Sequence, residues 1–173
     1  GLDKAKAEVR KTGVVILVEG QMDVIMSHQA GFKNTVASSG TALTEEQVKI
    51  LHRLSSRFLF AFDADSAGIE ATKKGVELTL NQDGDVLVID TPAGFKDSAE
   101  VINKNPVLWR EAAAKAAPYL NYLEEKVFAK FSKTLTPQDK RDIALEILPE
   151  IAKISDPIVA GDYVARLADR LKT

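Results

Sequence analysis

The sequence predicts an α/β protein whose mainly parallel, four-stranded sheet is followed by a small bundle of helices. Four short apolar runs, rich in β-branched and aromatic residues, are each typical of a strand buried on both faces. Helical stretches separate them, and crossovers of that length let successive strands run parallel. After about residue 105 no further strand-like run occurs. We therefore expect a doubly wound sheet within residues 13–105 and only helices in 106–173.

The first two strands are expected at residues 14–18 and 35–37. The run Val14–Val18 is entirely apolar, and Gly20 separates it from a helix of about residues 22–30. Gly31 ends that helix, because glycine readily adopts the left-handed conformation found after helices.

Thr44 begins the next helix, and Gln47 lies where it completes a capping box with Thr44. Two further strands and their helix follow in the same alternation. These elements are a helix at about 45–54, a strand at 58–62, a helix at about 67–80 and a strand at 86–89.

The residues after 105 are expected to be helical throughout. Thr136-Pro137 and Asp156-Pro157 each pair a capping side chain with proline at the first helical position. The expected helices are 108–131, either single or kinked at Pro118, then about 137–154 and about 157–171.

The composition excludes several kinds of site. Cysteine is absent and only two histidines occur, which excludes disulfides, thiolate sites and His-rich zinc sites. Any metal must be a hard cation held by carboxylates. The chain has no run long enough to span a membrane and opens with charged residues, so we expect a cytoplasmic protein without a signal peptide. The net charge of −2 argues against a free-standing nucleic-acid binder, and we expect a piece of a longer protein whose basic part lies elsewhere.

Carboxylates follow three of the expected strands. Glu19 follows the first, Asp63 the third, and Asp97 lies in the loop after the fourth. Asp65 is two residues beyond Asp63, and Asp23 lies on the first turn of the helix after Glu19. Ligands bind beyond the carboxyl ends of parallel strands, so these five acids are expected at one edge. Their mutual repulsion favours a cation, and the set predicts an Mg²⁺ site that handles phosphates.

A structural interpretation competes with this one. Acidic residues at strand ends often cap the next helix, and Asp65 before Ala67-Gly68 fits that role alone. The second acidic strand end, at Glu19-Gly20, favours the metal site.

Four motifs resemble the Toprim domain of bacterial DNA primases. Residues 18–24, Val-Glu-Gly-Gln-Met-Asp-Val, resemble its Glu-Gly-x-x-Asp signature, and residues 62–68 resemble its Asp-x-Asp-x-Ala-Gly signature. Residues 39–44 resemble the loop between its second strand and helix, and residues 92–97 its final acidic motif. The order and spacing of the four motifs extend the resemblance over nearly the whole chain.

The resemblance implies a nucleotidyltransferase that copies single-stranded DNA into short RNA primers from ribonucleoside triphosphates. It implies that Asp63 and Asp65 hold Mg²⁺, for which Mn²⁺ can substitute, and that Glu19 binds metal or assists proton transfer. Asp23 and Asp97 would enlarge the cluster of metal ligands. The residues expected near the substrate are Gly20, Ser39, Gly40, Thr41 and Lys96.

The resemblance also implies a domain plan. It assigns residues 1–12 to the end of a linker from an N-terminal half, 13–105 to the catalytic Toprim domain and 106–173 to a helical subdomain. Zinc is expected only in an N-terminal module outside this chain, and a replicative helicase is expected to bind through a C-terminal region outside it. The protein is then expected in the cytoplasm, associated with the nucleoid.

One motif departs from the family pattern. The final acidic motif of the family reads Asp-Pro-Asp, whereas this chain has Asp97-Ser98-Ala99, with Phe95 as an apparent insertion. The second carboxylate is therefore missing. Either Glu100 replaces it, or one metal position is weakened.

Other functions stay open at this stage. A Toprim topoisomerase needs a nucleophilic tyrosine, and Tyr119, Tyr122 and Tyr163 all lie on expected helices; a Toprim nuclease has no such requirement. A non-catalytic Toprim module, as in recombination mediators, has degenerate acids, whereas Glu19 and Asp63 are retained here. A phosphoacceptor receiver domain expects a lysine at the end of a late strand, and the fourth strand ends without one.

Overall fold

The computed structural model describes residues 1–40, 42–154 and 156–173. It divides into two compact units, Gly1–Pro118 and Tyr119–Thr173. This boundary lies later than the expected one at 105/106. The reason is helix α6 (Pro106–Ala114), whose Trp109 is fully buried in the core of the first unit.

The first unit contains a five-stranded sheet with the order β2-β1-β3-β4-β5. The pairs β2–β1, β1–β3 and β3–β4 are parallel, and β5 runs antiparallel to β4. The strands are β1 (Val14–Val18), β2 (Thr35–Ala37), β3 (Arg57–Phe60), β4 (Asp85–Val88) and β5 (Ala117–Pro118). The expected α/β class and the parallel order are confirmed, but the expected number of four strands is wrong by one.

Strand β5 also corrects the helical interpretation of residues 108–131. Ala117 pairs with Val88 and Pro118 with Leu87, so the chain leaves α6, adds this short strand and then begins α7 (Tyr119–Phe128). Proline has no N–H to donate, and an edge strand tolerates that loss. Two residues are too few to produce an alternating pattern that sequence could reveal.

Helices of the first unit follow the expected alternation, with two additional helices at Leu2–Thr12 and Ser98–Lys104. The capping box is confirmed, since the Gln47 N–H donates to Thr44 Oγ1 at 3.2 Å and the Thr44 N–H to Gln47 Oε1 at 3.0 Å. Within residues 1–12, expected as the end of a linker, Leu2–Thr12 forms a helix whose Ala5 and Val9 are fully buried. The helices are α1 (Leu2–Thr12), α2 (Gln21–Gln29), α3 (Glu45–His52), α4 (Ser66–Leu80), α5 (Ser98–Lys104) and α6.

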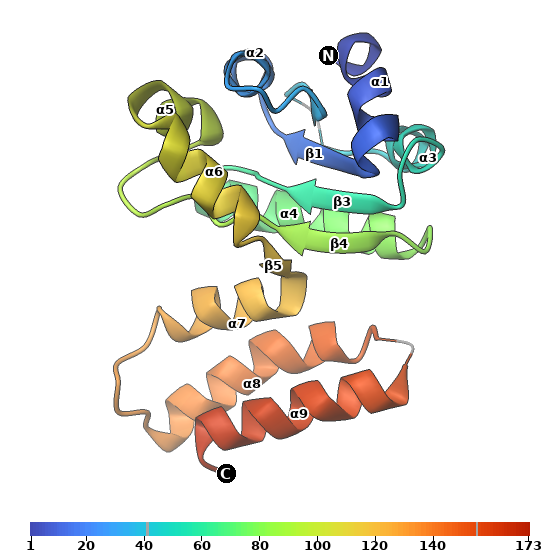
Figure 1. Ribbon diagram of the computed structural model, residues 1–173. Coiled ribbons are helices and arrows are strands. Elements are labelled where there is room, and N and C mark those ends of the chain that lie inside the picture. Colours follow the sequence, from blue (N-terminus) through green and yellow to red (C-terminus); the bar gives the residue numbers. More distant parts are fainter. Residues whose placement is uncertain (41, 155) are drawn as a thin grey trace. The chain divides into compact units, whose positions relative to one another are not determined.

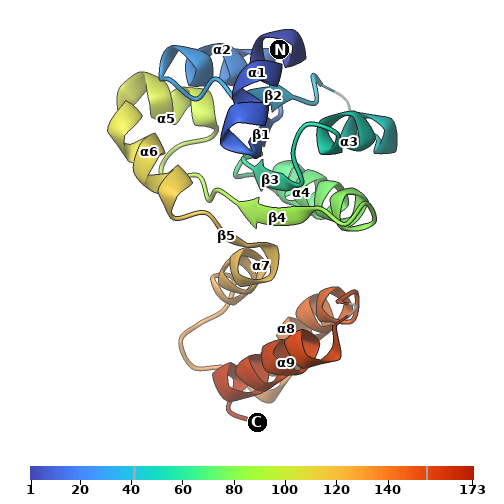
Figure 2. The same ribbon diagram turned by 45° about the vertical axis from the view of Figure 1, so that its right-hand side comes forward.

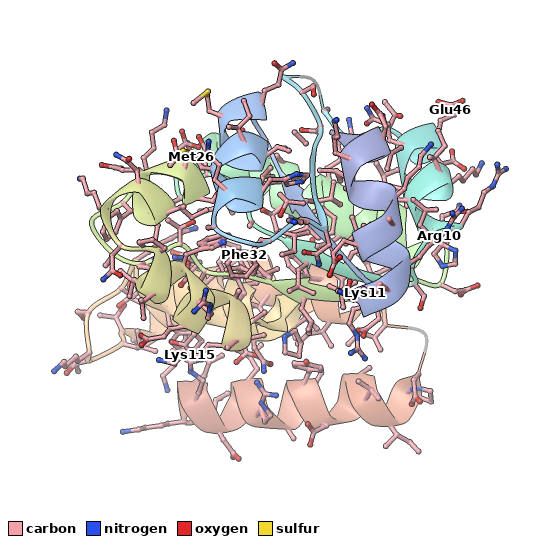
Figure 3. The ribbon with its side chains drawn as sticks, turned by 45° about the horizontal axis from the view of Figure 1, so that its top comes forward. Arg10, Lys11, Met26, Phe32, Glu46 and Lys115 are labelled. Carbon is pink, nitrogen blue, oxygen red and sulfur yellow. The ribbon has the colours of Figure 1, made fainter. Side chains whose placement is uncertain are left out.

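Helices cover both faces of the sheet, as a doubly wound fold requires (Figures 1 and 2). On one face, side chains of β1 and β3 pack with those of α2, α5 and α6 around Trp109. The ring of Phe32, labelled in Figure 3, meets Trp109 edge to face at 6.4 Å between centroids. On the other face α4 lies against β3 so closely that a Cβ at Gly75 would overlap the ring of Phe60.

This topology has a switch point between β1 and β3. The chain leaves β1 through α2 toward β2, and it leaves β3 through α4 toward β4, on the opposite side. The two loops therefore diverge above neighbouring strand ends, and in open α/β sheets ligands bind at such a switch point.

The second unit contains α7, α8 (Pro137–Ile151) and α9 (Pro157–Leu171). Both expected caps are present: Thr136 Oγ1 accepts from the Asp139 N–H, and Asp156 Oδ1 from the Ile158 N–H. Glu124 of α7 is almost fully buried and pairs with Arg170 of α9 at 3.3 Å. No helix in the described ranges is long and apolar enough to cross a membrane.

The position of Trp109 leads to a truncation test. A chain of residues 1–118 is expected to unfold cooperatively, whereas a chain of residues 1–105 loses Trp109 and exposes the core that it fills. Removal of a buried tryptophan side chain costs about 3–5 kcal/mol, so we expect a stability difference of at least that order. Urea unfolding of both chains, followed by circular dichroism, measures it. Equal stability would contradict the unit boundary at Pro118.

Candidate active site

Glu19 joins the loops that follow β1, β2 and β3. Its carboxylate oxygen Oε1 accepts a hydrogen bond from the Asp63 N–H at 3.0 Å. Its carbonyl oxygen accepts one from the Ser39 N–H at 3.1 Å. The register pairs Leu17 of β1 with Phe60 of β3, so Glu19 and Asp63 leave the sheet at almost the same level. The structure thus brings the first two predicted acids together at the switch point.

Asp65 caps the following helix, which is one of the two roles that its position suggested; its role as a metal ligand stays a prediction. It is exposed, and its Oδ1 accepts the Gly68 N–H at 2.9 Å as the N-cap of α4. Gly68 is required there, because a Cβ at this position would overlap the carbonyl oxygen of Asp63. The Ala-Gly of the motif therefore lets α4 begin directly against the strand end that carries Asp63.

Asp23 is a buried hydrogen-bond acceptor at the base of the site. Only 7% of the residue is exposed. Its Oδ2 accepts the Gly20 N–H at 3.1 Å, and its Oδ1 accepts the Ser98 hydroxyl at 2.8 Å and the Ala99 N–H at 2.9 Å. Asp23 therefore ties the turn after β1 to the first turn of α5. Sequence reasoning missed Ser98, whose signal was its replacement of the family's proline.

The loop between β4 and α5 has its own hydrogen bonds. Asp97 caps α5 through the Glu100 N–H at 2.8 Å. The Glu100 carboxylate accepts the Lys96 N–H at 2.9 Å and pairs with Lys104 at 2.8 Å. The hydrogen bond from Lys104, followed by that from the Lys96 backbone, lowers the pKa of the exposed Glu100 carboxyl. Glu100 is thus engaged within its own loop, and nothing in its contacts gives it the place of the missing acid.

Asp63 holds the least compensated negative charge of the site. Burial, followed by the negative charges of Glu19, Asp23 and Asp97, raises the pKa of this carboxyl from 3.8 to about 6. Lys96 opposes them, with its Nζ 3.9 Å from Asp63 Oδ2. A carboxyl with so high a pKa marks a position where a cation would be bound favourably.

Four of the five residues expected near substrate lie in the described loops that follow β1, β2 and β4. Gly20 caps α2 at the turn after Glu19. Ser39 and Gly40 both have left-handed backbone conformations, with φ of 64° and 76°, in the loop after β2. Lys96 reaches Asp63, as described above. Thr41 lies outside the described residues.

The acids fit a hard divalent cation that keeps part of its own coordination shell. Within the described ranges, no three His, Asp or Glu side chains stand close enough to hold a metal by themselves. Mg²⁺ is commonly bound by one or two carboxylates, with water and substrate phosphates as its other ligands. The oxygen donors at Glu19, Asp63 and Asp65, together with the weakly compensated charge of Asp63, suit that arrangement.

Comparison with known proteins decides the family. A family model described as Toprim-like matches residues 16–102. The chain belongs to the Toprim-like family. This Toprim chain is 32% identical over 159 residues to a DNA primase of Clostridium acetobutylicum, an alignment that covers 90% of the chain and 26% of that relative. The motif-based resemblance to bacterial DNA primases is confirmed, and membership implies the use of a divalent metal.

Two solved structures support the resemblance to DNA primases. The RNA polymerase domain of Mycobacterium tuberculosis primase DnaG has a TM-score of 0.81 and 26% identity, covering 97% of this chain and 54% of that one. A DNA primase domain from Pseudomonas aeruginosa has a TM-score of 0.74 and 30% identity, covering 99% and 55%. The Toprim chain thus spans about half of these domains and 26% of the Clostridium relative.

The raised pKa of Asp63 predicts a pH-dependent stability. From its usual value of 3.8 up to about 6, the metal-free folded protein keeps a proton that the unfolded chain releases, so folding loses stability as pH rises through this window. Asp63→Asn has no ionisable group at this position, so it does not lose this stability as the pH rises. Above pH 6.5 we expect the variant to be more stable than the wild type by about 1–3 kcal/mol, and near pH 4 we expect no difference.

Urea unfolding between pH 4 and pH 8 in the presence of EDTA measures this difference. Glu70→Gln, at an exposed position of α4, is the control and should leave the profile unchanged. A stability gain of Asp63→Asn that is the same at every pH would contradict the assignment.

Proposed function

We propose that this Toprim chain is the catalytic part of a DNA primase, which makes short RNA primers on single-stranded DNA by metal-dependent nucleotidyl transfer. The observation that carries the proposal is the raised pKa of the Asp63 carboxyl, in a residue whose N–H donates to Glu19 at the switch point of the sheet. The matching solved structures support it, since their domains are described as primase domains, one bound to single-stranded DNA and one to double-stranded DNA.

In this proposal Glu19, Asp63 and Asp65 hold Mg²⁺, and Mn²⁺ can substitute for it. The ion supplies charge stabilisation for the transferring phosphoryl group when it is bound. With a pKa of about 6, the Asp63 carboxyl is mostly ionised at neutral pH and can accept the ion, and Glu19 keeps the Asp63 backbone in place through its Oε1. Asp23 and Asp97 add negative charge around the site, as their effect on Asp63 indicates.

The substrates follow from the reaction. A ribonucleotide 3′-hydroxyl attacks the α-phosphate of an incoming ribonucleoside triphosphate, and pyrophosphate leaves. Lys96, beside Asp63, is a cation that can bind the phosphates, and the loops at Gly20 and at Ser39-Gly40 border the same edge. The helicase partner, the external zinc module and the cytoplasmic, nucleoid-associated location stay predictions.

Metal binding tests the site directly. We expect Mn²⁺ to bind the chain and Asp63→Ala and Asp65→Ala each to weaken binding about tenfold or more, because each removes an anionic oxygen ligand. Isothermal titration calorimetry measures the affinities. Asp85→Ala is the matched control, since Asp85 begins β4 at the opposite end of the sheet and pairs with Arg57 at 2.8 Å. Unchanged binding in both Asp63→Ala and Asp65→Ala would refute the site.

Primer synthesis by the chain alone is expected to be weak or absent. Nucleic-acid affinity depends on basic surface, and this chain has a net charge of −2. Incorporation of labelled ribonucleotides on single-stranded DNA measures it, with a full-length DNA primase as the positive control. Robust synthesis by the 173-residue chain would show that the template site lies within it, contrary to the proposal.

A further inference from the structure

Hydrogen bonds of the Lys96 backbone fix this residue beside Asp63. Its N–H donates to Glu100 Oε2 at 2.9 Å, and its carbonyl oxygen accepts the Ala64 N–H at 3.1 Å. The loop of Lys96 is thereby joined to the residue that follows Asp63. The side chain is nevertheless 69% exposed, so its ammonium group has room to move.

The preceding residues make this loop a defined turn. The Phe95 N–H donates to the Pro92 carbonyl at 3.2 Å, and Gly94 between them has a φ of 88°. Phe95 packs against the core cluster, and Lys104 Nζ lies 5.4 Å from the centre of its ring. The apparent insertion at Phe95 therefore anchors the turn and sets the position from which Lys96 reaches the site.

Lys96 provides the local counter-charge for the acidic edge. Among the described residues, its contact with Asp63 is the one ion pair made by the five acids Glu19, Asp23, Asp63, Asp65 and Asp97. The separation of 3.9 Å and the exposure of the lysine make it a weak pair. A divalent ion that binds Asp63 carries twice the charge and would repel the ammonium group at this range.

We propose that Lys96 is a displaceable counter-cation: it pairs with Asp63 in the metal-free protein, gives way to the divalent ion, and then binds the phosphate groups of the substrate. This inference rests on the proposed function. The flexible four-carbon stem of lysine allows both positions, and an ammonium group binds phosphate as a point charge. Binding of the metal and binding of the substrate are thereby linked, because the divalent ion releases the Lys96 ammonium group, which then binds the substrate phosphates.

The linkage predicts opposite effects on two ligands. In Lys96→Met, the Mn²⁺ affinity is expected to rise about threefold, because the competing charge is gone. Binding of inorganic tripolyphosphate to the Mn²⁺-saturated protein is expected to fall about threefold or more, because its cation is gone. Lys96→Arg should keep both affinities within about twofold, since it preserves the charge. Both are measured by calorimetry at low ionic strength, where the charge effects are largest.

Lys115→Met is the matched control. It removes one positive charge from the same unit, at the end of α6 (Figure 3), and should change neither affinity. If Lys96→Met merely distorted the loop, the affinities for Mn²⁺ and for tripolyphosphate would both fall. A higher Mn²⁺ affinity together with a lower tripolyphosphate affinity is therefore specific to displacement. Unchanged or weaker Mn²⁺ binding by Lys96→Met would overturn the inference. Equal Mn²⁺ binding by the wild type and Asp63→Ala would instead overturn the proposed function.

Discussion

Repulsion among the carboxylates at the switch point is the physical constraint on which the structure of this edge of the sheet depends. The fold relieves most of it with local donors. Asp65 and Asp97 cap helices, Asp23 accepts three hydrogen bonds, and Glu19 accepts the Asp63 N–H. The Asp63 carboxylate has only the distant Lys96 among the described residues, and its pKa is raised to about 6. The least compensated negative charge is thus that of the Asp63 side chain, and a cation would bind most favourably there.

The packing of the first unit maintains that arrangement. Parallel pairing of β1 with β3 brings Glu19 and Asp63 to the same level, and Gly68 lets α4 begin against the second strand end. Asp23 joins α2 to α5, while α6 seals the face beneath them with Trp109. A disturbance of this core would therefore move the acids relative to one another, since Glu19 and Asp23 accept hydrogen bonds from the loop after β3 and from α5.

Much of this could be predicted from the sequence because it is encoded locally. The buried strands, the capping box at Thr44 and the acids at strand ends all depend on neighbours a few residues apart. The remainder depends on distant contacts. The hydrogen bond between Ser98 and Asp23 spans 75 residues, and β5 exists only because two residues meet the edge of β4. The helix Leu2–Thr12 buries Ala5 and Val9 against distant parts of the unit, which composition alone does not reveal.

The central claim is that Asp63 is the focus of a divalent-metal site at the edge between β1 and β3. Anomalous diffraction from crystals soaked in Mn²⁺ tests it most directly, because it locates the ion without requiring catalysis. The account predicts an anomalous peak beside the Asp63 carboxylate, with Glu19 and Asp65 as its protein neighbours and water at its other positions. A peak at Asp97 and Glu100 with none at Asp63, or no peak at this edge at saturating Mn²⁺, would contradict it.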